Sequence, residues 1–485
     1  MQSLALRLAR WGEGPGAGAI DPAAGAGTVF TVRARLALLA AFALVVMLRL
    51  PLAWLHGRFL DEEGTIFFAY AWHHDAGDAM WRSFGGYLNL AANGFTLLAA
   101  RLVRGGVLPL EYAPYLTMTI ALAFQMIPAA LLLFGRATWL ANRWAVIAAL
   151  LILATSPMTE EVFYNVLHIQ LHLALAAAII LALDPPRTRL GTIGCGAILF
   201  VGPLCGPAAI ILLPFFALRT LLERDRARLF QTAMLGAGAA VQLLVFFYPS
   251  PVRGHFLDPV SLGAVLFVRM IAMPLSNSVV ASLLSDRIFE DWNQSGFGWL
   301  LAPLALLGYF GTLIWLALRN RRDAAVWLIV PGLAMGAISF GGGMIINYTY
   351  DWFGLGAGQR YNFIPLVLVG LGLISLTRRL EGRARRWVAY LCFFTVVSGT
   401  ITFWHPIEEL RRGPAWRDQV ALWQRDHHLL LRSWPRSWKV DLSEHKRPCS
   451  VPVPGQLSTT DPTYCESSWI IRVKNPETME SNVEP

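Results

Sequence analysis

The chain has 485 residues, of which 55% are hydrophobic and only 15% are charged. Soluble domains carry about 25% charged residues, so this composition excludes an ordinary soluble enzyme and predicts an integral membrane protein. The formal net charge is +9, but the arginines lie in short clusters between apolar segments. That placement is typical of cytoplasmic loops and argues against nucleic acid as a partner.

Apolar stretches near the length of a bilayer's hydrocarbon core recur as far as residue 404. None of them alternates polar and apolar residues as the strands of an outer-membrane barrel do. We therefore predict an all-α, polytopic membrane helix bundle with about eleven spanning helices in a bacterial inner membrane. Residues 1–31 are expected to form a disordered cytoplasmic leader, residues 32–404 the transmembrane domain, and residues 405–485 a periplasmic tail.

The first spanning helix is expected over Arg35–Leu55, with its N-terminus in the cytoplasm because arginines precede it. Residues 56–111 then form the first outer loop. Within this loop, Thr65–Trp72 and Tyr87–Arg104 have helical periodicity, but they are short and carry polar residues. We predict that both are amphipathic helices on the outer surface.

The other spans are placed so that every arginine-rich hairpin faces the cytoplasm. They are Tyr112–Phe134, Leu140–Ser156, Val166–Leu183, two short limbs within Leu190–Leu218, Phe230–Tyr248, Phe297–Leu318, Ala324–Ile346, Tyr361–Thr377 and Trp387–Trp404. If Tyr87–Arg104 crossed the membrane, all the later arginine clusters would lie outside. The N-terminus is therefore predicted inside and the C-terminus outside. On that side, Cys449 and Cys465 of the tail could form a disulfide.

Two acidic clusters follow predicted helices on the same outer side. Asp61 and Glu62 come after the first helix, and Glu160 and Glu161 come after the third. One interpretation is that both clusters are solvated loop residues that mark the outer side. The other is that they converge on an outer cavity, where one carboxylate acts as a general base and Asp61 with Glu161 binds a divalent metal ion.

Further polar residues lie close to these clusters in the predicted topology. His168 and His172 are four residues apart on one helix face, beside Asn165. This spacing can bind a metal, but no carboxylate lies between the two histidines, so a polar stripe that lines an aqueous cavity is the favoured interpretation. Tyr87 in the first outer loop is expected to line the same cavity.

Arg360 and Tyr361 open a late helix at its predicted outer end. An arginine there departs from the positive-inside pattern, and its guanidinium could hold a lipid phosphate with two hydrogen bonds. The alternative is an interfacial side chain that extends toward water. Other outer arginines could serve the same purpose, namely Arg58, Arg82, Arg101 and Arg104. The sequence has no glycine-rich nucleotide loop, no serine–histidine–aspartate spacing and no Cys-x-x-Cys motif.

The order of these elements resembles the GT-C-type glycosyltransferases that use polyprenyl-phosphate sugars. The short sequences Phe59–Glu63, Gly86–Asn89, Glu161–Asn165 and Arg360-Tyr361 also resemble a group of bacterial membrane proteins with this architecture. The resemblance covers about the first 400 residues. It implies an inverting transfer of a sugar to an acceptor hydroxyl at the periplasmic face, where the acceptor is a glycan, a lipid or a protein.

By this resemblance, Asp61 or Glu62 would engage the acceptor, and Glu160 or Glu161 would be the second acidic site. Arg360 would bind the phosphate of the polyprenyl-phosphate sugar. Membrane lipids are the other expected partners, and a divalent metal is the one cofactor considered. Two alternatives stay open: a flippase or other transporter of lipid-linked glycans, and a non-catalytic scaffold with the same architecture.

Overall fold

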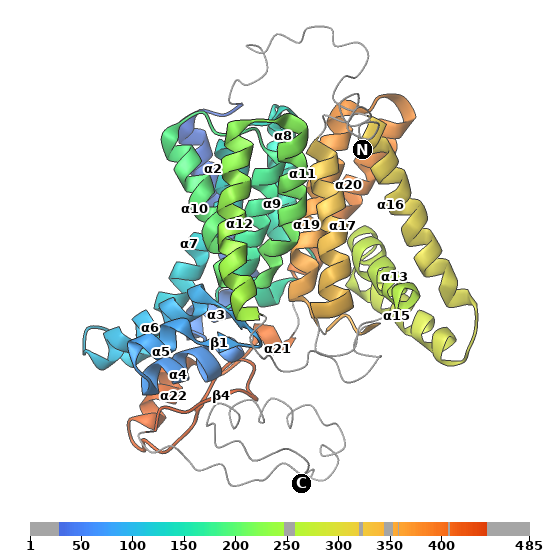
Figure 1. Cartoon of the computed structure of the whole chain (residues 1–485). Coiled ribbons are helices and arrows are strands. Elements are labelled where there is room, and N and C mark those ends of the chain that lie inside the picture. Colours follow the sequence, from blue (N-terminus) through green and yellow to red (C-terminus); the bar gives the residue numbers. More distant parts are fainter. Residues whose placement is uncertain are drawn as a thin grey trace.

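The computed structural model describes residues 29–246, 258–319, 324–343, 353–356, 358–405 and 408–443. Nearly all of the predicted leader lies outside these ranges, as do Cys449 and Cys465. The described chain is a bundle of helices with a group of short helices and strands at one end (Figure 1). The predicted all-α membrane helix bundle is confirmed at this level.

Most of the main helices of the bundle follow one another with short connections, but longer segments separate α2 from α7, α12 from α16 and α17 from α19. They are α2 (Val32–Arg49), α7 (Ala113–Phe134), α8 (Arg143–Thr155), α9 (Ile169–Ala182), α10 (Arg189–Cys205), α11 (Leu213–Glu223), α12 (Arg226–Phe246), α16 (Leu301–Arg319), α17 (Ala324–Ile338), α19 (Arg360–Arg379) and α20 (Gly382–Phe403). Short 3₁₀ helices join several of them, at Leu110–Tyr112, Thr138–Leu140, Glu160–Val162, Pro207–Leu212 and Gly298–Leu300. Each predicted span has a helical counterpart.

Six helices of the described chain are long and apolar enough to cross a bilayer. They are Leu110–Phe134, Arg226–Val245, Gly298–Arg319, Ala324–Gly342, Arg360–Arg379 and Gly382–Phe403. Four shorter apolar helices accompany them, at Arg143–Thr155, Ile169–Ala182, Arg189–Cys205 and Pro259–Leu275. Large apolar side chains are exposed on the outside of the bundle, among them Leu244, Leu307 and Phe393. Such a surface would be unfavourable in water, and it suits contact with lipid.

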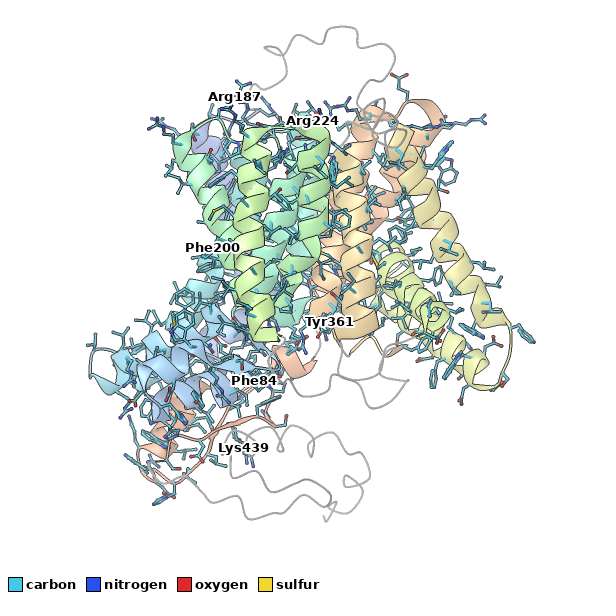
Figure 2. All side chains as sticks on the ribbon, in the orientation of Figure 1. Phe84, Arg187, Phe200, Arg224, Tyr361 and Lys439 are labelled. Carbon is cyan, nitrogen blue, oxygen red and sulfur yellow. The ribbon has the colours of Figure 1, made fainter. Side chains whose placement is uncertain are left out.

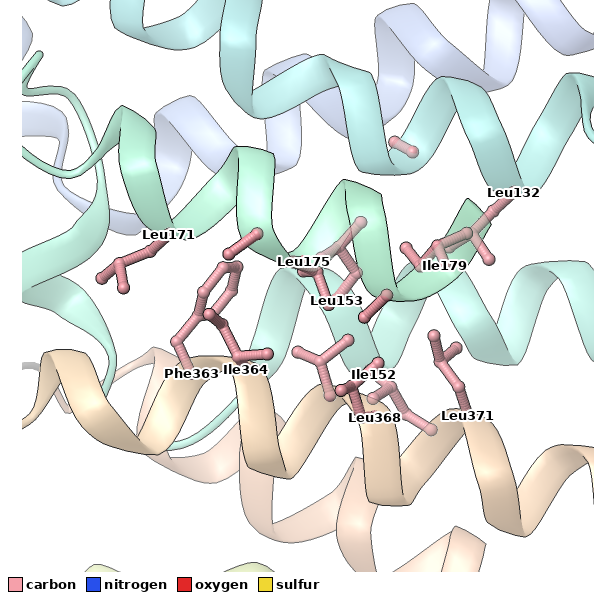
Figure 3. Packing of buried hydrophobic residues seen from close by; sticks show 14 of the residues in the cluster. Leu132, Ile152, Leu153, Leu171, Leu175, Ile179, Phe363, Ile364, Leu368 and Leu371 are labelled. Atoms are coloured by element: carbon pink, nitrogen blue, oxygen red, sulfur yellow. The ribbon is translucent and has the colours of Figure 1, made fainter. Parts of the chain in front are cut away.

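Helices α9 and α19 form the centre of the bundle. Every residue of α9 is buried, and so are the residues of α19 from Asn362 to Leu376. Figure 3 shows Leu175 and Ile179 of α9 beside Leu368 and Leu371 of α19. Glycine permits close packing here, since a methyl group at Gly370 would lie 2.8 Å from Ile152 Cγ2 of α8. This packing fixes the first turn of α19 beside the first turn of α9.

The first outer loop forms a compact helical unit at one end of the bundle (Figure 1). It follows the short helix α3 (Pro51–His56), which contains the end of the predicted first span. Its elements are a π-helix at Glu63–Phe68, α4 (Ala69–His73), α5 (Ala76–Trp81), the hairpin β1 (Ser83–Phe84) and β2 (Tyr87–Leu88), and α6 (Leu90–Arg104). The predicted helix at Tyr87–Arg104 therefore begins three residues late. The reason is that Tyr87 and Leu88 pair with β1, and the Asn89 side chain then caps α6 by accepting from Ala92 N.

Two other segments complete the fold. Residues 258–293 form a helical hairpin of α13 (Pro259–Phe267), a π-helix at Val268–Ala272, α14 (Met273–Leu275) and α15 (Ser278–Asn293). A third π-helix, Ser339–Gly343, follows α17. The described part of the tail contains α21 (Glu408–Arg411), α22 (Trp416–Trp423) and the pair β3 (Leu431–Arg432) and β4 (Lys439–Val440), and it packs on the first outer loop through Phe59, Phe68 and Trp416.

The two ends of the bundle differ in charge and in attached elements. Arg187 and Arg224 lie at one end, whereas Tyr361, Phe84 and Lys439 lie at or beyond the other (Figure 2). This arrangement agrees with a topology in which the arginine hairpins share one side of the membrane and the first outer loop shares the other with the tail.

Cysteine labelling tests this topology. In a background without the five native cysteines, Asp78→Cys and Arg187→Cys each place a thiol at an exposed position. A membrane-impermeant maleimide added to intact cells is expected to label position 78 at once and position 187 only after lysis. Labelling of both positions from the same side would contradict the topology.

Candidate functional site

Asp61 is held in an unusual backbone conformation where the first outer loop meets the tail. Its φ is 46°, a left-handed value that few residues other than glycine, asparagine and aspartate adopt. Its N–H donates to the Trp434 carbonyl at 2.7 Å, and Trp434 N in turn donates to the Phe59 carbonyl at 3.2 Å. Ser433 Oγ also donates to the Phe59 carbonyl, at 2.6 Å. The tail thus fixes the backbone that carries the Asp61 carboxylate.

Two buried arginines connect the first outer loop and α2 to the segment between α8 and α9. Arg49, the last residue of α2, donates to the Ala154 carbonyl at 2.9 Å and the Ser156 carbonyl at 2.8 Å. Arg58 donates to the Phe163 carbonyl at 2.8 Å and the Leu410 carbonyl at 3.4 Å. Arginine suits this purpose because its planar group carries several donors in a fixed geometry.

Glu63 makes a further connection between the same two segments. Its carboxylate is buried and accepts from Leu60 N and from Val166 N, each at 3.1 Å, and it also bonds with the Thr117 side chain. Burial raises the pKa of Glu63 to about 7, and these hydrogen bonds moderate the rise. All of its contacts are internal, so Glu63 organises the loop and does not face a ligand.

The second acidic cluster is divided between two roles. Glu160 turns inward, where its Oε1 accepts from Arg49 Nη2 at 2.9 Å with both side chains almost fully buried. Glu161 turns the other way and contacts α19. Its Oε1 is 2.5 Å from Arg360 Nη1, its Oε2 accepts from Arg360 N at 3.3 Å, and His168 Nε2 lies 3.8 Å from Oε1.

The charges of Asp61 and Glu161 act on each other. Burial raises the pKa of Asp61 well above its usual range, the negative charges of Glu62 and Glu161 raise it further, and Arg360 and Arg58 oppose the rise. Burial acts to raise the pKa of Glu161 as well. The positive charge of Arg360 and the neighbouring His168 have the larger combined effect, so the pKa of Glu161 is lowered. The two carboxyl groups therefore share one site with opposite shifts, a pattern typical of acid–base sites.

The remaining predicted site residues are distributed around this centre. Glu62 is half-buried next to Asp61, and Tyr361 bonds with the Arg360 side chain. Asn165 is structural, since it donates to the Glu161 and Phe163 carbonyls and accepts from His168 N.

His172 and Tyr87 lie outside the charged centre. His172 Nε2 lies 3.1 Å from the Val162 carbonyl, and its ring packs on Phe363 at 4.9 Å between centroids. Tyr87 accepts from Gln170 Nε2 at 3.4 Å. A role for either side chain in lining a cavity stays a prediction.

The other arginines that were predicted as phosphate-binding candidates make internal contacts. Arg58 is fully buried, and Arg82, Arg101 and Arg104 donate to backbone carbonyls of Ile66, His74 and Trp72. These contacts tie the first outer loop together. Arg360 differs because 37% of its side-chain surface remains exposed beside the carboxylates.

The part of the chain that the structure describes contains no cluster of metal-binding side chains. No group of three histidine, cysteine or acidic side chains lies there within reach of one ion. Asp61 and Glu161 would supply carboxylate oxygens of the kind that Mg²⁺ and Ca²⁺ prefer, but the nearest further partner of Glu161 is the Arg360 cation, which competes with a metal.

Several residues that build the site were not predicted from the sequence. Trp434 is the main example, because nothing in its local sequence indicates that its carbonyl would meet Asp61, more than 370 residues away. Arg49 is the second example, because it lies within the predicted first span Arg35–Leu55 and nothing in its local sequence indicates its partners. The one signal available was a charged residue inside an apolar span.

Comparison with known proteins adds no assignment. No family model matches the chain, and no curated protein matches it.

The neighbouring glutamates offer a matched test of their different roles. Glu160→Gln leaves the buried Arg49 cation without its counter-charge and is expected to cost about 3–5 kcal/mol of stability. Glu161→Gln leaves a partly exposed arginine and is expected to cost about 1 kcal/mol or less. The melting temperature of each purified variant in the same detergent measures this. Equal decreases in melting temperature, or a larger decrease for Glu161→Gln, would show that the two roles are wrongly assigned.

Proposed function

We propose that the chain is a membrane glycosyltransferase of the GT-C type. It transfers a sugar from a polyprenyl-phosphate donor to an acceptor hydroxyl at the periplasmic face, with inversion at the anomeric carbon. The observation that carries this proposal is the environment of the Asp61 carboxylate. Its carboxylate receives no side-chain hydrogen bond from the described residues, its pKa is raised, and it lies near Glu161 and Arg360.

The chemistry assigns each group one step. Asp61 accepts the proton of the acceptor hydroxyl while the acceptor oxygen forms a bond to the anomeric carbon. The bond from that carbon to the phosphate oxygen breaks, and polyprenyl phosphate leaves with an additional negative charge. The exposed part of the Arg360 guanidinium stabilises that charge, and its low-dielectric surroundings strengthen the contact. The proton on Asp61 then returns to water.

Glu161 orients the phosphate-binding cation in this scheme. It holds Arg360 by the side chain and the backbone at once, so the guanidinium is in place before the donor binds. Preorganisation of this kind removes the cost of ordering a long, flexible side chain during the reaction. Glu161 is therefore a positioning residue, and Asp61 is the catalytic base.

A transporter of lipid-linked glycans is the second candidate, and one feature favours it. Between α10 and α11 the chain reverses at Gly206 through the 3₁₀ helix Pro207–Leu212, and interrupted helices are common in transporters. A transporter moves the intact donor across the bilayer, whereas a transferase releases polyprenyl phosphate from it.

Turnover by the purified protein separates these functions. The protein in nanodiscs is mixed with undecaprenyl phosphate carrying glucose, mannose or arabinose and with a membrane extract as acceptor, and the released undecaprenyl phosphate is measured. Asp61→Asn is expected to lower turnover by about 10²–10⁴-fold, because the base is lost while asparagine still tolerates the left-handed backbone. Asp78→Asn, an exposed acid of the same loop, is the control and is expected to keep full turnover. Equal turnover in wild type and Asp61→Asn would contradict the role of the base.

The pH dependence of turnover gives an independent test. A base acts only when it is deprotonated, and the pKa of Asp61 is raised. Turnover is therefore expected to rise with pH, with its inflection above the ordinary aspartate value of about 3.9. A profile that stays flat through the acidic range, or that falls as pH rises there, would show that deprotonated Asp61 does not limit the reaction.

A further inference from the structure

Three buried polar atoms near the ion pair have no hydrogen-bond partner among the described residues. They are Gln359 Oε1, Asn362 Oδ1 and His168 Nδ1. Their side chains are almost fully buried, with 3%, 1% and 2% of the residue surface exposed, respectively. Native proteins leave very few buried polar atoms unpaired, and each exception calls for an explanation such as a ligand. These three belong to residues that flank Arg360 in the sequence or contact Glu161, which makes the surroundings of the ion pair the candidate for a binding site.

The two amides present their oxygen atoms to this region. Asn362 Nδ2 is directed at the Met158 carbonyl, and Gln359 Nε2 is directed at the Gly356 carbonyl, each at 3.4 Å. Reversing either amide would place its oxygen against a carbonyl oxygen, so the orientation is set by the contacts. The unpaired end of each amide is therefore an acceptor, and only a donor group can satisfy it.

The three atoms lie on elements that meet at the ion pair. Gln359 and Asn362 are three residues apart at the start of α19, so they share one face of the helix. Asn362 contacts Met158, which belongs to the same short segment as Glu161, and Glu161 lies between Arg360 and His168. His168 Nε2 lies 3.8 Å from the Glu161 carboxylate, and in the tautomer that carries its proton on Nε2 the unpaired Nδ1 is a third acceptor.

This combination of groups selects a particular kind of ligand. The oxygens of a phosphate diester accept hydrogen bonds and cannot satisfy amide oxygens, whereas the hydroxyl groups of a sugar ring can donate to all three acceptors. Arg360, which suits the phosphate, lies in the sequence between Gln359 and Asn362. In a polyprenyl-phosphate sugar the phosphate and the ring are bonded directly, so adjacent subsites are required.

We propose that Gln359, Asn362 and His168 form a hydroxyl-binding subsite that holds the sugar ring of the donor next to its phosphate on Arg360. This inference rests on the proposed function and adds the residues that distinguish a sugar-bearing lipid from bare polyprenyl phosphate.

Two size-matched substitutions test the subsite. Gln359→Met and Asn362→Leu remove the acceptors and keep similar side-chain volumes, and Gln424→Met, at an exposed position of the tail, is the control. The probes are undecaprenyl phosphate and its glucose, mannose and arabinose derivatives, and their Kd values are measured with the full-length protein in nanodiscs. For the sugar lipid that wild type binds most tightly, each variant is expected to raise the Kd by about tenfold. The Kd for undecaprenyl phosphate is expected to stay unchanged, and the melting temperature to stay equal or rise.

The other outcomes overturn the inference in distinguishable ways. If a variant raises the Kd for the sugar lipid and for undecaprenyl phosphate equally, or changes neither Kd, the two amides do not recognise the sugar. The proposed transferase function would still stand. If the melting temperature falls without selective loss of the sugar lipids, the amides are structural and the subsite is absent. If wild type binds none of the four lipids, the proposed function and the subsite both fail.

Discussion

The ion pair between Glu161 and Arg360 is the contact on which the site depends. The two residues are 199 positions apart, and the pair joins the segment before α9 to the first turn of α19. Because both helices are buried along most of their length, their first turns are fixed with respect to each other. Arg360 lowers the pKa of Glu161, whereas burial, together with the negative charges of Glu62 and Glu161, raises the pKa of Asp61. One site thereby holds two carboxyl groups with different proton affinities.

The surroundings of the pair are built by backbone contacts more than by side-chain recognition. Arg49 and Arg58 donate to carbonyls of Ser156 and Phe163 in the segment between α8 and α9, and the Trp434 carbonyl accepts from the Asp61 N–H. Removing any of these would leave buried donors or acceptors unpaired, which is costly in a low-dielectric environment. The tail is therefore part of the site, although it follows the last membrane-length helix. Together these contacts explain how Asp61 can keep a left-handed backbone conformation.

Sequence patterns predicted the helices better than the site. The length and spacing of apolar runs indicated each main helix, and errors occurred at helix ends, where capping by Asn89 and Asn142 shifted the first turn. The sequence also identified both acidic clusters and Arg360. It could not separate Glu160 from Glu161, because which of two adjacent side chains faces Arg49 depends on the 3₁₀ turn at Glu160–Val162 and on packing far away in the chain. The same limit applies to Trp434, whose contact with Asp61 arises only from tertiary structure.

The structure of the protein with a candidate donor lipid is the most direct test of the proposed function. In a cryo-electron microscopy structure of the protein in nanodiscs with an undecaprenyl-phosphate sugar, we expect the phosphate beside Arg360 and the Asp61 carboxylate facing the anomeric carbon. Glu161 should still contact Arg360 or His168. Donor density at another part of the bundle, or an Asp61 carboxylate separated from the anomeric carbon by packed protein, would contradict the account.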